Sequence, residues 1–245
     1  MLALLLSIVF AAFYYAAESS GEVLVVASDI LFVLVSGVCS VFSYLVLRRW
    51  GTGGMMGTAR LGFFLGMFLW FLGELGWTVF EVIMNVPIPY PSLADVFYLC
   101  GYLPVAVGVM RLLSVFKNQI DRKRILVAIF TAVVVAGLTG VFVLQPLLVE
   151  STDLLSGFLD IAYPILDLVI LMPCLLVMLT FSGGSMAKSW LWITFGLALT
   201  TLADLLFIHG TLTGWYYSGH PAELPYLWGY VCLGLGFQIQ RTELG

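Results

Sequence analysis

Charged residues are scarce in this chain, and this scarcity decides its class. Only 10% of its 245 residues are charged, whereas 62% are hydrophobic, and the mean hydropathy is +1.08. Globular domains carry about 25% charged residues, so a chain of this composition cannot hide its apolar surface in a soluble core. The formal net charge of −4 comes without a basic patch, which argues against nucleic acid as a partner.

Cysteine, histidine and catalytic motifs are also sparse. The four cysteines fall in four different apolar segments, without the spacing of a metal or redox site, so they are expected to pack as small apolar residues. Neither glycine-rich loop continues into the Lys-Ser/Thr pair of a phosphate-binding loop, and no nucleophile elbow occurs. We therefore expect no enzymatic activity and no cofactor.

Long apolar segments are what the sequence has in abundance. Most approach the roughly 20 residues that a helix needs to cross about 30 Å of hydrocarbon. They cover residues 1–17, 23–47, 61–84, 96–116, 125–149, 154–181, 189–213 and 225–240. The predicted fold class is all-α: a polytopic membrane helical bundle of about eight transmembrane helices, forming one domain over residues 1–245 in the lipid bilayer. Segment 1–17 lacks a basic start, so we interpret it as a retained span rather than a cleaved signal peptide.

The basic residues occupy only alternate gaps between these segments, apart from Arg111, which lies near the inner end of segment 96–116. They are Arg48, Arg49 and Arg60; Arg111, Lys117, Arg122, Lys123 and Arg124; Lys188; and Arg241. The intervening gaps carry acids and no base. Because basic loops are retained on the cytoplasmic side, the alternation predicts a multi-pass protein of the cell (plasma) membrane with both termini in the cytoplasm.

A short motif occurs twice. Residues 94–102 (ADVFYLCGY) and 222–230 (AELPYLWGY) match in register, and two acid pairs, Glu74 with Asp204 and Asp29 with Asp160, follow nearly the same offset. Both motif helices are predicted to run inward, which indicates two parallel four-helix repeats, about 1–118 and 119–245. Chance similarity between two aromatic, glycine-containing membrane helices is the alternative.

Carboxylic acids lie inside the apolar segments, with no lysine or arginine deep enough to pair with them. They are Asp29, Glu74, Glu81, Asp160, Asp167 and Asp204. An unpaired carboxylate in the bilayer costs at least about 2.5 kcal/mol, so such residues are expected to face the bundle interior or a wet cavity. Spacing by seven places Glu74 with Glu81, and Asp160 with Asp167, nearly on one helix face. Acids that are merely hydrogen-bonded inside the bundle are the structural alternative.

Further candidates complete the expected ligand-binding set. Tyr163 precedes Pro164 between the two acids of its segment, and a proline frees backbone carbonyls that can line a cavity. His209, Asp95 and Glu223 are expected near the outer ends of their segments. Two imidazoles, His209 and His220, plus a carboxylate make a zinc site conceivable, so the presence of a metal stays open.

Three segments carry a family resemblance: 91–102 (PSLADVFYLCGY), 163–168 (YPILDL) and 223–230 (ELPYLWGY). Together they resemble the multi-span membrane sensor, or input, domain found before prokaryotic GGDEF, EAL and histidine-kinase signalling domains. The resemblance covers roughly residues 61–240, includes an acid in the penultimate span, here Asp204, and names no catalytic residue. This sequence departs from that arrangement because no output domain follows. The resemblance implies a stand-alone member that signals through a partner, or an excised input region.

The leading hypothesis is thus a membrane-embedded sensory module whose outward-facing acidic cavity binds a polar or cationic small ligand. Its signal would pass to a cytoplasmic or membrane partner, or through a homodimer. A small cation- or proton-coupled transporter is the alternative, since parallel repeats and intramembrane acids also occur there. A scaffold with internally satisfied acids is a third.

Overall fold

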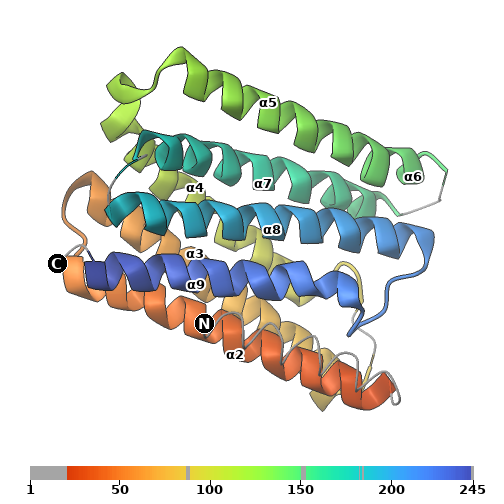
Figure 1. The fold of residues 1–245 in the computed structure, drawn as a ribbon. Helices are drawn as coiled ribbons and strands as arrows, with labels where there is room; N and C mark the ends of the chain where they lie inside the picture. The colour runs from red at the N-terminus through yellow and green to blue at the C-terminus, as the bar shows by residue number, and fades with distance from the viewer. Residues whose placement is uncertain (1–20, 87–88, 150–152, 182, 184, 244–245) are drawn as a thin grey trace.

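The computed structural model describes residues 21–86, 89–149, 153–181, 183 and 185–243. Seven long helices make up nearly all of this described part (Figure 1). They are α2 (Gly21–Trp50), α3 (Gly54–Thr78), α4 (Leu93–Phe116), α5 (Arg122–Thr139), α7 (Leu154–Thr180), α8 (Ser185–Thr213) and α9 (Leu224–Glu243). The expected all-α bundle is confirmed, whereas the predicted span at 1–17 lies outside the described residues.

The helices pack side by side with their axes roughly aligned (Figure 1). The closest partners are α3 with α4 and α8 with α9; α2 lies against α3 and α9, and α7 lies against α4 and α8. Helix α5 contacts mainly α7 and forms an outer edge of the bundle. Short connections between antiparallel neighbours produce this arrangement.

Glycines allow the two closest helix pairs to form. A Cβ atom built on Gly62 would lie 2.2 Å from the carbonyl oxygen of Pro104, and one built on Gly196 would lie 2.8 Å from the carbonyl oxygen of Gly229. Membrane helices associate largely through packing of this kind, because small residues let backbones approach each other. The sequence spaces these glycines where α3 meets α4 and where α8 meets α9.

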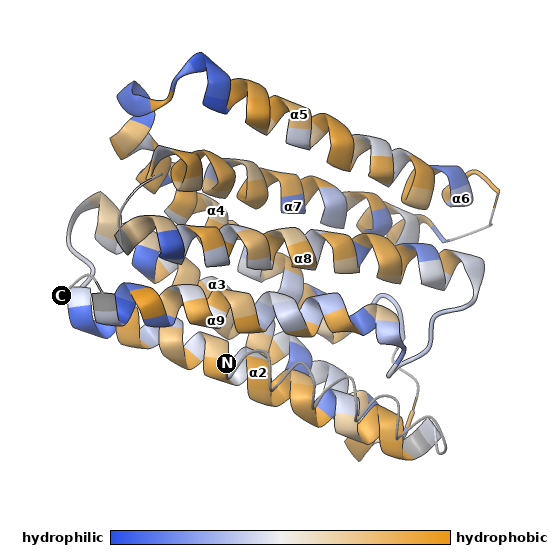
Figure 2. Cartoon of the chain, in the orientation of Figure 1, coloured by the Kyte–Doolittle hydropathy of each residue, from blue (hydrophilic) through white to orange (hydrophobic). Residues whose placement is uncertain are grey.

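Six of the helices are long and apolar enough to span a membrane. Helix α9 falls short among the described residues, because its tyrosines, tryptophan and polar C-terminal turn lower its hydropathy. Apolar side chains cover the outer surface, and Figure 2 shows them over most of α5 and α2. In the apolar windows of α7 and α8, 50% of residues are buried, but only 11% in that of α5. This surface is that of a bundle whose outer faces contact lipid.

The basic residues gather at one end of the bundle, as the alternation predicts. Hydrophilic residues mark that end in Figure 2, at the start of α5 and near the C-terminus. It contains the end of α2, the start of α5 and the end of α9, with Arg48, Arg122 and Arg241 among the bases. We call it the basic end. The opposite end contains the starts of α4 and α9, and we call it the cavity end after the cavity described below.

Two helices contain a wider turn before they finish. Helix α3 continues into the π-helical turn η1 (Val79–Ile83), and α5 continues through η3 (Gly140–Leu144) into the short α6 (Gln145–Leu147). A π-helical turn hydrogen-bonds over five residues instead of four, so side chains beyond it change phase around the axis. By contrast, α7 runs unbroken from Leu154 to Thr180 with Pro164 and Pro173 inside it.

Candidate functional site

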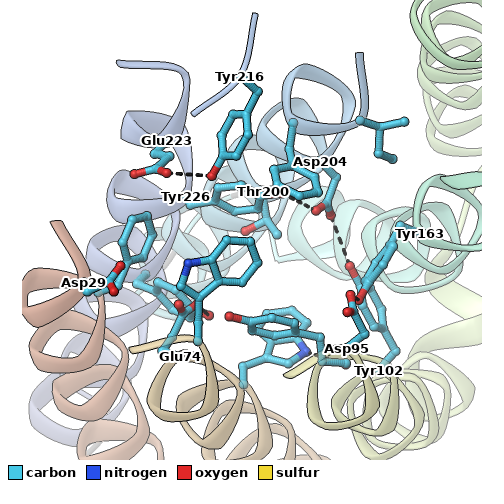
Figure 3. A pocket seen from close by; sticks show the side chains of 17 residues that line it. Asp29, Glu74, Asp95, Tyr102, Tyr163, Thr200, Asp204, Tyr216, Glu223 and Tyr226 are labelled. Carbon is cyan, nitrogen blue, oxygen red and sulfur yellow. Dashed lines mark hydrogen bonds between the residues drawn. The ribbon is translucent and has the colours of Figure 1, made fainter. Parts of the chain in front are cut away.

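A cavity of about 100 Å³ lies inside the bundle, in the half away from the basic end. Figure 3 shows its lining from close by. Its wall is built from α2, α3, α4, α7, α8 and α9 and the loop that precedes α9. The lining residues are Asp29, Phe32, Trp70, Glu74, Trp77, Asp95, Tyr98, Tyr102, Tyr163, Thr200, Asp204, Phe207, Ile208, Tyr216, Glu223, Tyr226 and Tyr230. The wall therefore consists almost entirely of carboxylic acids and aromatic rings.

Among the described residues, no lysine, arginine or histidine contributes to this wall. Its five acids, Asp29, Glu74, Asp95, Asp204 and Glu223, are each at most 9% exposed. A buried charge ordinarily has an opposite charge beside it, because removing an ion from water costs far more than a neutral group's burial. The wall has an acidic character that the protein's own cations do not neutralise.

Tyrosine hydroxyls take the place of cations as partners of these acids. In each pair the acceptor and the donor lie on different helices or on a helix and a loop, and two of the pairs join parts of the chain that are far apart in sequence. Tyr230 donates to Glu74 at 2.7 Å, Tyr163 to Asp95 at 2.7 Å, Tyr216 to Glu223 at 2.6 Å, and Tyr226 to Asp204. A hydrogen bond to a carboxyl group offsets much of its burial cost, and the network fixes how α3, α4, α7, α8 and α9 stand around the cavity.

Tyr102 connects two acids at once. Its hydroxyl oxygen lies 2.8 Å from Oδ1 of Asp167 and 3.3 Å from Oδ2 of Asp204 (Figure 3 draws the bond to Asp204). A phenol has one proton, so it donates to one carboxyl group and accepts from the other only if that group carries a proton. Tyr102 thus joins Asp167, which lies outside the cavity wall, to Asp204, which lies in it.

Two wall acids are also fixed by the backbone. Asp95 accepts a hydrogen bond from the N–H of Ser92 at 2.7 Å, which completes a capping box at the start of α4. Glu223 accepts from the Ser28 hydroxyl at 2.8 Å and from the N–H of Gly219 at 3.0 Å. The sequence signals for these positions are local: a Ser three residues before an Asp, and a Glu in the turn before α9.

Asp29 differs from the other wall acids. It projects from α2 and is only 4% exposed, yet its Oδ2 atom has no hydrogen-bond partner among the described residues. The cavity is the open space next to this side chain. A buried carboxyl oxygen without a donor is unfavourable, and it is relieved by a water molecule or by a ligand that donates to it.

The structure brings together six of the ten residues predicted from the sequence. Asp29, Glu74, Asp95, Tyr163, Asp204 and Glu223 line the cavity. The other four, Glu81, Asp160, Asp167 and His209, lie outside its wall. Asp160 accepts from Tyr90 at 2.6 Å, and Asp167 accepts from Tyr102, which belongs to the wall.

Glu81 and His209 turn away for local reasons. Glu81 lies in η1, where the wider turn changes its direction, and it accepts from Trp77 Nε1 at 2.8 Å and from the Ser218 hydroxyl at 2.6 Å. The Nδ1 atom of His209 lies 3.0 Å from the carbonyl oxygen of Phe142 in η3. His209 therefore links α8 to the outer edge of the bundle.

The described residues contain no group of three His, Cys, Asp or Glu side chains placed to hold a metal ion. The conceivable zinc site is therefore not assembled there. His220 instead caps the short helix η4 (Pro221–Glu223), where its Nδ1 accepts from the N–H of Ala222 at 3.0 Å. Burial lowers the pKa of this imidazole, which favours the neutral form that accepts the bond.

The tyrosine partners are what the sequence reasoning missed. Tyr98, Tyr102, Tyr226 and Tyr230 belong to the repeated motif, where they served only as evidence of duplication. Their spacing of four places each pair on one helix face, and that spacing next to intramembrane acids is the signal that could have identified them. Trp70 was not singled out at all; its ring packs 5.3 Å from that of Tyr102.

Comparison of the whole chain with protein-family models, with curated proteins and with solved structures finds no match in any of the three. No relative lends this chain an activity. The chemistry of the cavity is the basis on which a function can be assigned.

Proposed function

We propose that this protein is a membrane-embedded sensory module whose cavity binds a small polar or cationic ligand. One observation carries the proposal: five buried acids and ten aromatic side chains surround a cavity to which no basic side chain of the described part of the chain contributes. A concave site with a few convergent polar groups in an apolar surround is the usual form of a small-molecule site. Intramembrane acids around it mark a functional site by default.

The bundle offers a way for binding to be transmitted. We infer that the helix pairs α3 with α4 and α8 with α9 are equivalent parts of two parallel repeats. Reciprocal hydrogen bonds support this: Tyr230 donates to Glu74, while Tyr102 bonds Asp204, and these residues correspond in the two proposed halves. A ligand that binds one arrangement of the halves better than the other shifts the population between them. The basic end, predicted to be cytoplasmic, would then pass the change to a partner protein or to a second copy.

A cation- or proton-coupled transporter is the second candidate, because Tyr102 joins the intramembrane acids Asp167 and Asp204 by hydrogen bonds. Transport requires polar access from both membrane faces. Toward the basic end the buried hydroxyls are bonded to backbone carbonyls: Ser43 to Ser40 at 2.7 Å, and Thr194 to Cys174 at 3.2 Å. No acid among the described residues is buried in that half, which favours sensing over transport.

Thermal unfolding of the detergent-purified full chain tests the proposal. The melting temperature would be measured with ammonium compounds, polyamines, sugars and divalent cations, for the wild type, Asp204→Asn and the control Asp121→Asn. Asp121 caps α5 at the basic end, and asparagine caps nearly as well. We expect at least one ligand to stabilise the wild type and the control but not Asp204→Asn. A panel that stabilises none of the three proteins, or all three equally, would refute a ligand site in the cavity.

A further inference from the structure

The hydrogen-bond inventory of the cavity wall identifies one anchor. Both carboxyl oxygens of Asp95, Asp204 and Glu223 accept hydrogen bonds, and Glu74 accepts from Tyr230. Asp29 alone among the wall acids has a fully buried oxygen, Oδ2, without a partner in the described part of the chain. Oδ2 of Asp29 is therefore the fully buried acceptor of the wall that a ligand in the cavity can satisfy.

Charge decides what kind of donor fits this acceptor. The other wall acids already accept from hydroxyls and backbone N–H groups. No basic residue contributes to the wall where the structure describes the chain. A neutral donor would satisfy Oδ2 of Asp29 but would leave the acidic surroundings without a counter-charge. A positively charged donor does both, and hydrogen bonds between charged partners are roughly twice as strong as neutral ones.

The rest of the wall favours an organic cation over a metal ion. Aromatic rings make up most of it, including Phe32, which lies one turn after Asp29, and Tyr226, whose ring packs 6.4 Å from that of Phe32. Aromatic faces attract cations and are the usual walls of sites for alkylated ammonium groups. A divalent metal prefers several oxygen ligands at once, and no suitable cluster exists among the described residues.

The size of the cavity limits the ligand. About 100 Å³ is available, and an apolar cavity of roughly 150 Å³ holds one benzene molecule. We propose that the cavity binds a small, singly charged organic ammonium ion, with its N–H groups on Asp29 and its alkyl groups against the aromatic wall. This inference rests on the proposed ligand-binding function and adds the ligand class and the anchoring residue.

A matched pair of probes tests the class. tert-Butylammonium and tert-butanol have the same shape and differ in the charged group, so calorimetric titration of the full chain with each isolates the contribution of charge. Calcium chloride at equal ionic strength serves as the metal probe. We expect tert-butylammonium to bind and the other two to give no saturable heat. Equal binding of the alcohol, or tighter binding of calcium, would overturn the ammonium assignment while leaving a ligand site in place.

Asp29→Asn tests the anchor. It keeps the shape of the side chain and removes the charge, and we expect its affinity for tert-butylammonium to fall by about tenfold or more, which corresponds to about 1.4 kcal/mol. Asp121→Asn is the matched control and keeps wild-type affinity. If Asp29→Asn does not fold, Phe32→Leu replaces it: this variant keeps the carboxylate and loses one aromatic face, and weaker binding of the ammonium ion is expected.

The outcomes separate the two proposals. Unchanged ammonium affinity in both variants would show that Asp29 and Phe32 are not the site, and would overturn the inference. Binding of a neutral sugar or a polyamine, insensitive to Asp29→Asn but abolished by Asp204→Asn, would refute the ligand class and retain the proposed function. No binding of any probe, in a protein that melts cooperatively, would count against both.

Discussion

The two ends of the bundle use glycine for different purposes. Toward the basic end, glycines bring backbones together: a Cβ on Gly62 would meet the Pro104 carbonyl oxygen at 2.2 Å, and one on Gly236 would meet that of Ser189 at 2.9 Å. Toward the cavity end, glycines make room for rings: a Cβ on Gly73 would lie 2.4 Å from the ring of Tyr98, and one on Gly101 2.4 Å from that of Trp70.

This difference shows how one bundle combines a rigid half with a polar one. Backbone contact at the basic end leaves the helices little freedom to separate. At the cavity end, the rings of Tyr98 and Trp70 fill the space beside the glycines, and hydroxyls of other tyrosines bond the acids. The geometry of the cavity therefore depends on hydrogen bonds, whereas the geometry of the basic end depends on packing.

The largest effect is expected from Gly62→Ala at the basic end. The new methyl group would meet a backbone oxygen that cannot rotate away, so α3 and α4 must separate. Overpacking of this kind costs typically about 1–3 kcal/mol. Gly137→Ala is the control, because nothing lies within 4 Å of a Cβ at that position. Thermal or denaturant unfolding in detergent would compare them, and equal stabilities would contradict a packing role for Gly62.

Gly101→Ala sharpens the same contrast. Its methyl group would meet the indole of Trp70, a side chain, so a smaller loss of stability is expected than for Gly62→Ala. Trp70 Nε1 donates to the carbonyl oxygen of Tyr98 at 3.0 Å, and displacement of the ring would disturb this bond. Tryptophan fluorescence would report the displacement. A stability loss as large as that of Gly62→Ala would contradict the proposed difference between glycines that contact backbone and glycines that contact rings.

Tyr230→Phe should act at the cavity end by a different mechanism. It removes the hydroxyl that bonds Glu74 and leaves a buried carboxyl oxygen with one donor fewer, at a cost of about 1–3 kcal/mol. Tyr217→Phe is the control because Tyr217 is 54% exposed. In the double variant with Glu74→Gln, the loss should be less than the sum of the two single losses. Additive losses would show that the pair is not coupled.

Sequence reasoning predicted the features that depend on single residues or on local periodicity. Acids without nearby bases had to face the interior, and Asp29, Glu74 and Asp204 do. Helix boundaries were displaced by a few residues, as at α8, which begins at Ser185 rather than at 189. The eighth predicted segment forms α9, whose aromatic and polar residues keep it below the hydropathy of the other six.

The remaining features required the three-dimensional arrangement. Spacing by seven could not place Glu81, because the π-helical turn η1 changes its phase. Tyrosine partners could not be assigned either: Tyr230 and Glu74 are 156 residues apart in sequence, and pairing over such a distance depends on how the helices pack. The charge pattern gives the sites of unpaired acids, but only the packing shows which donors reach them.

The smallest effect is expected from Asp153→Ala, at the exposed start of α7. Asp153 Oδ1 accepts from the N–H groups of Leu155 and Ser156, each at 3.0 Å. Hydrogen bonds from Ser156, hydroxyl and backbone, lower the pKa of Asp153 below its usual 3.8. A carboxylate with a lowered pKa stabilises the folded state above its unfolded pKa, and this contribution disappears as the pH falls through the folded value.

The melting temperature of Asp153→Ala should therefore be slightly below that of the wild type at neutral pH and converge with it below pH of about 3. A difference in melting temperature that persists in acid would mean that Asp153 stabilises α7 through its shape and not through its charge. The start of α7 would then differ from the neighbouring cavity, whose geometry depends on its carboxyl groups.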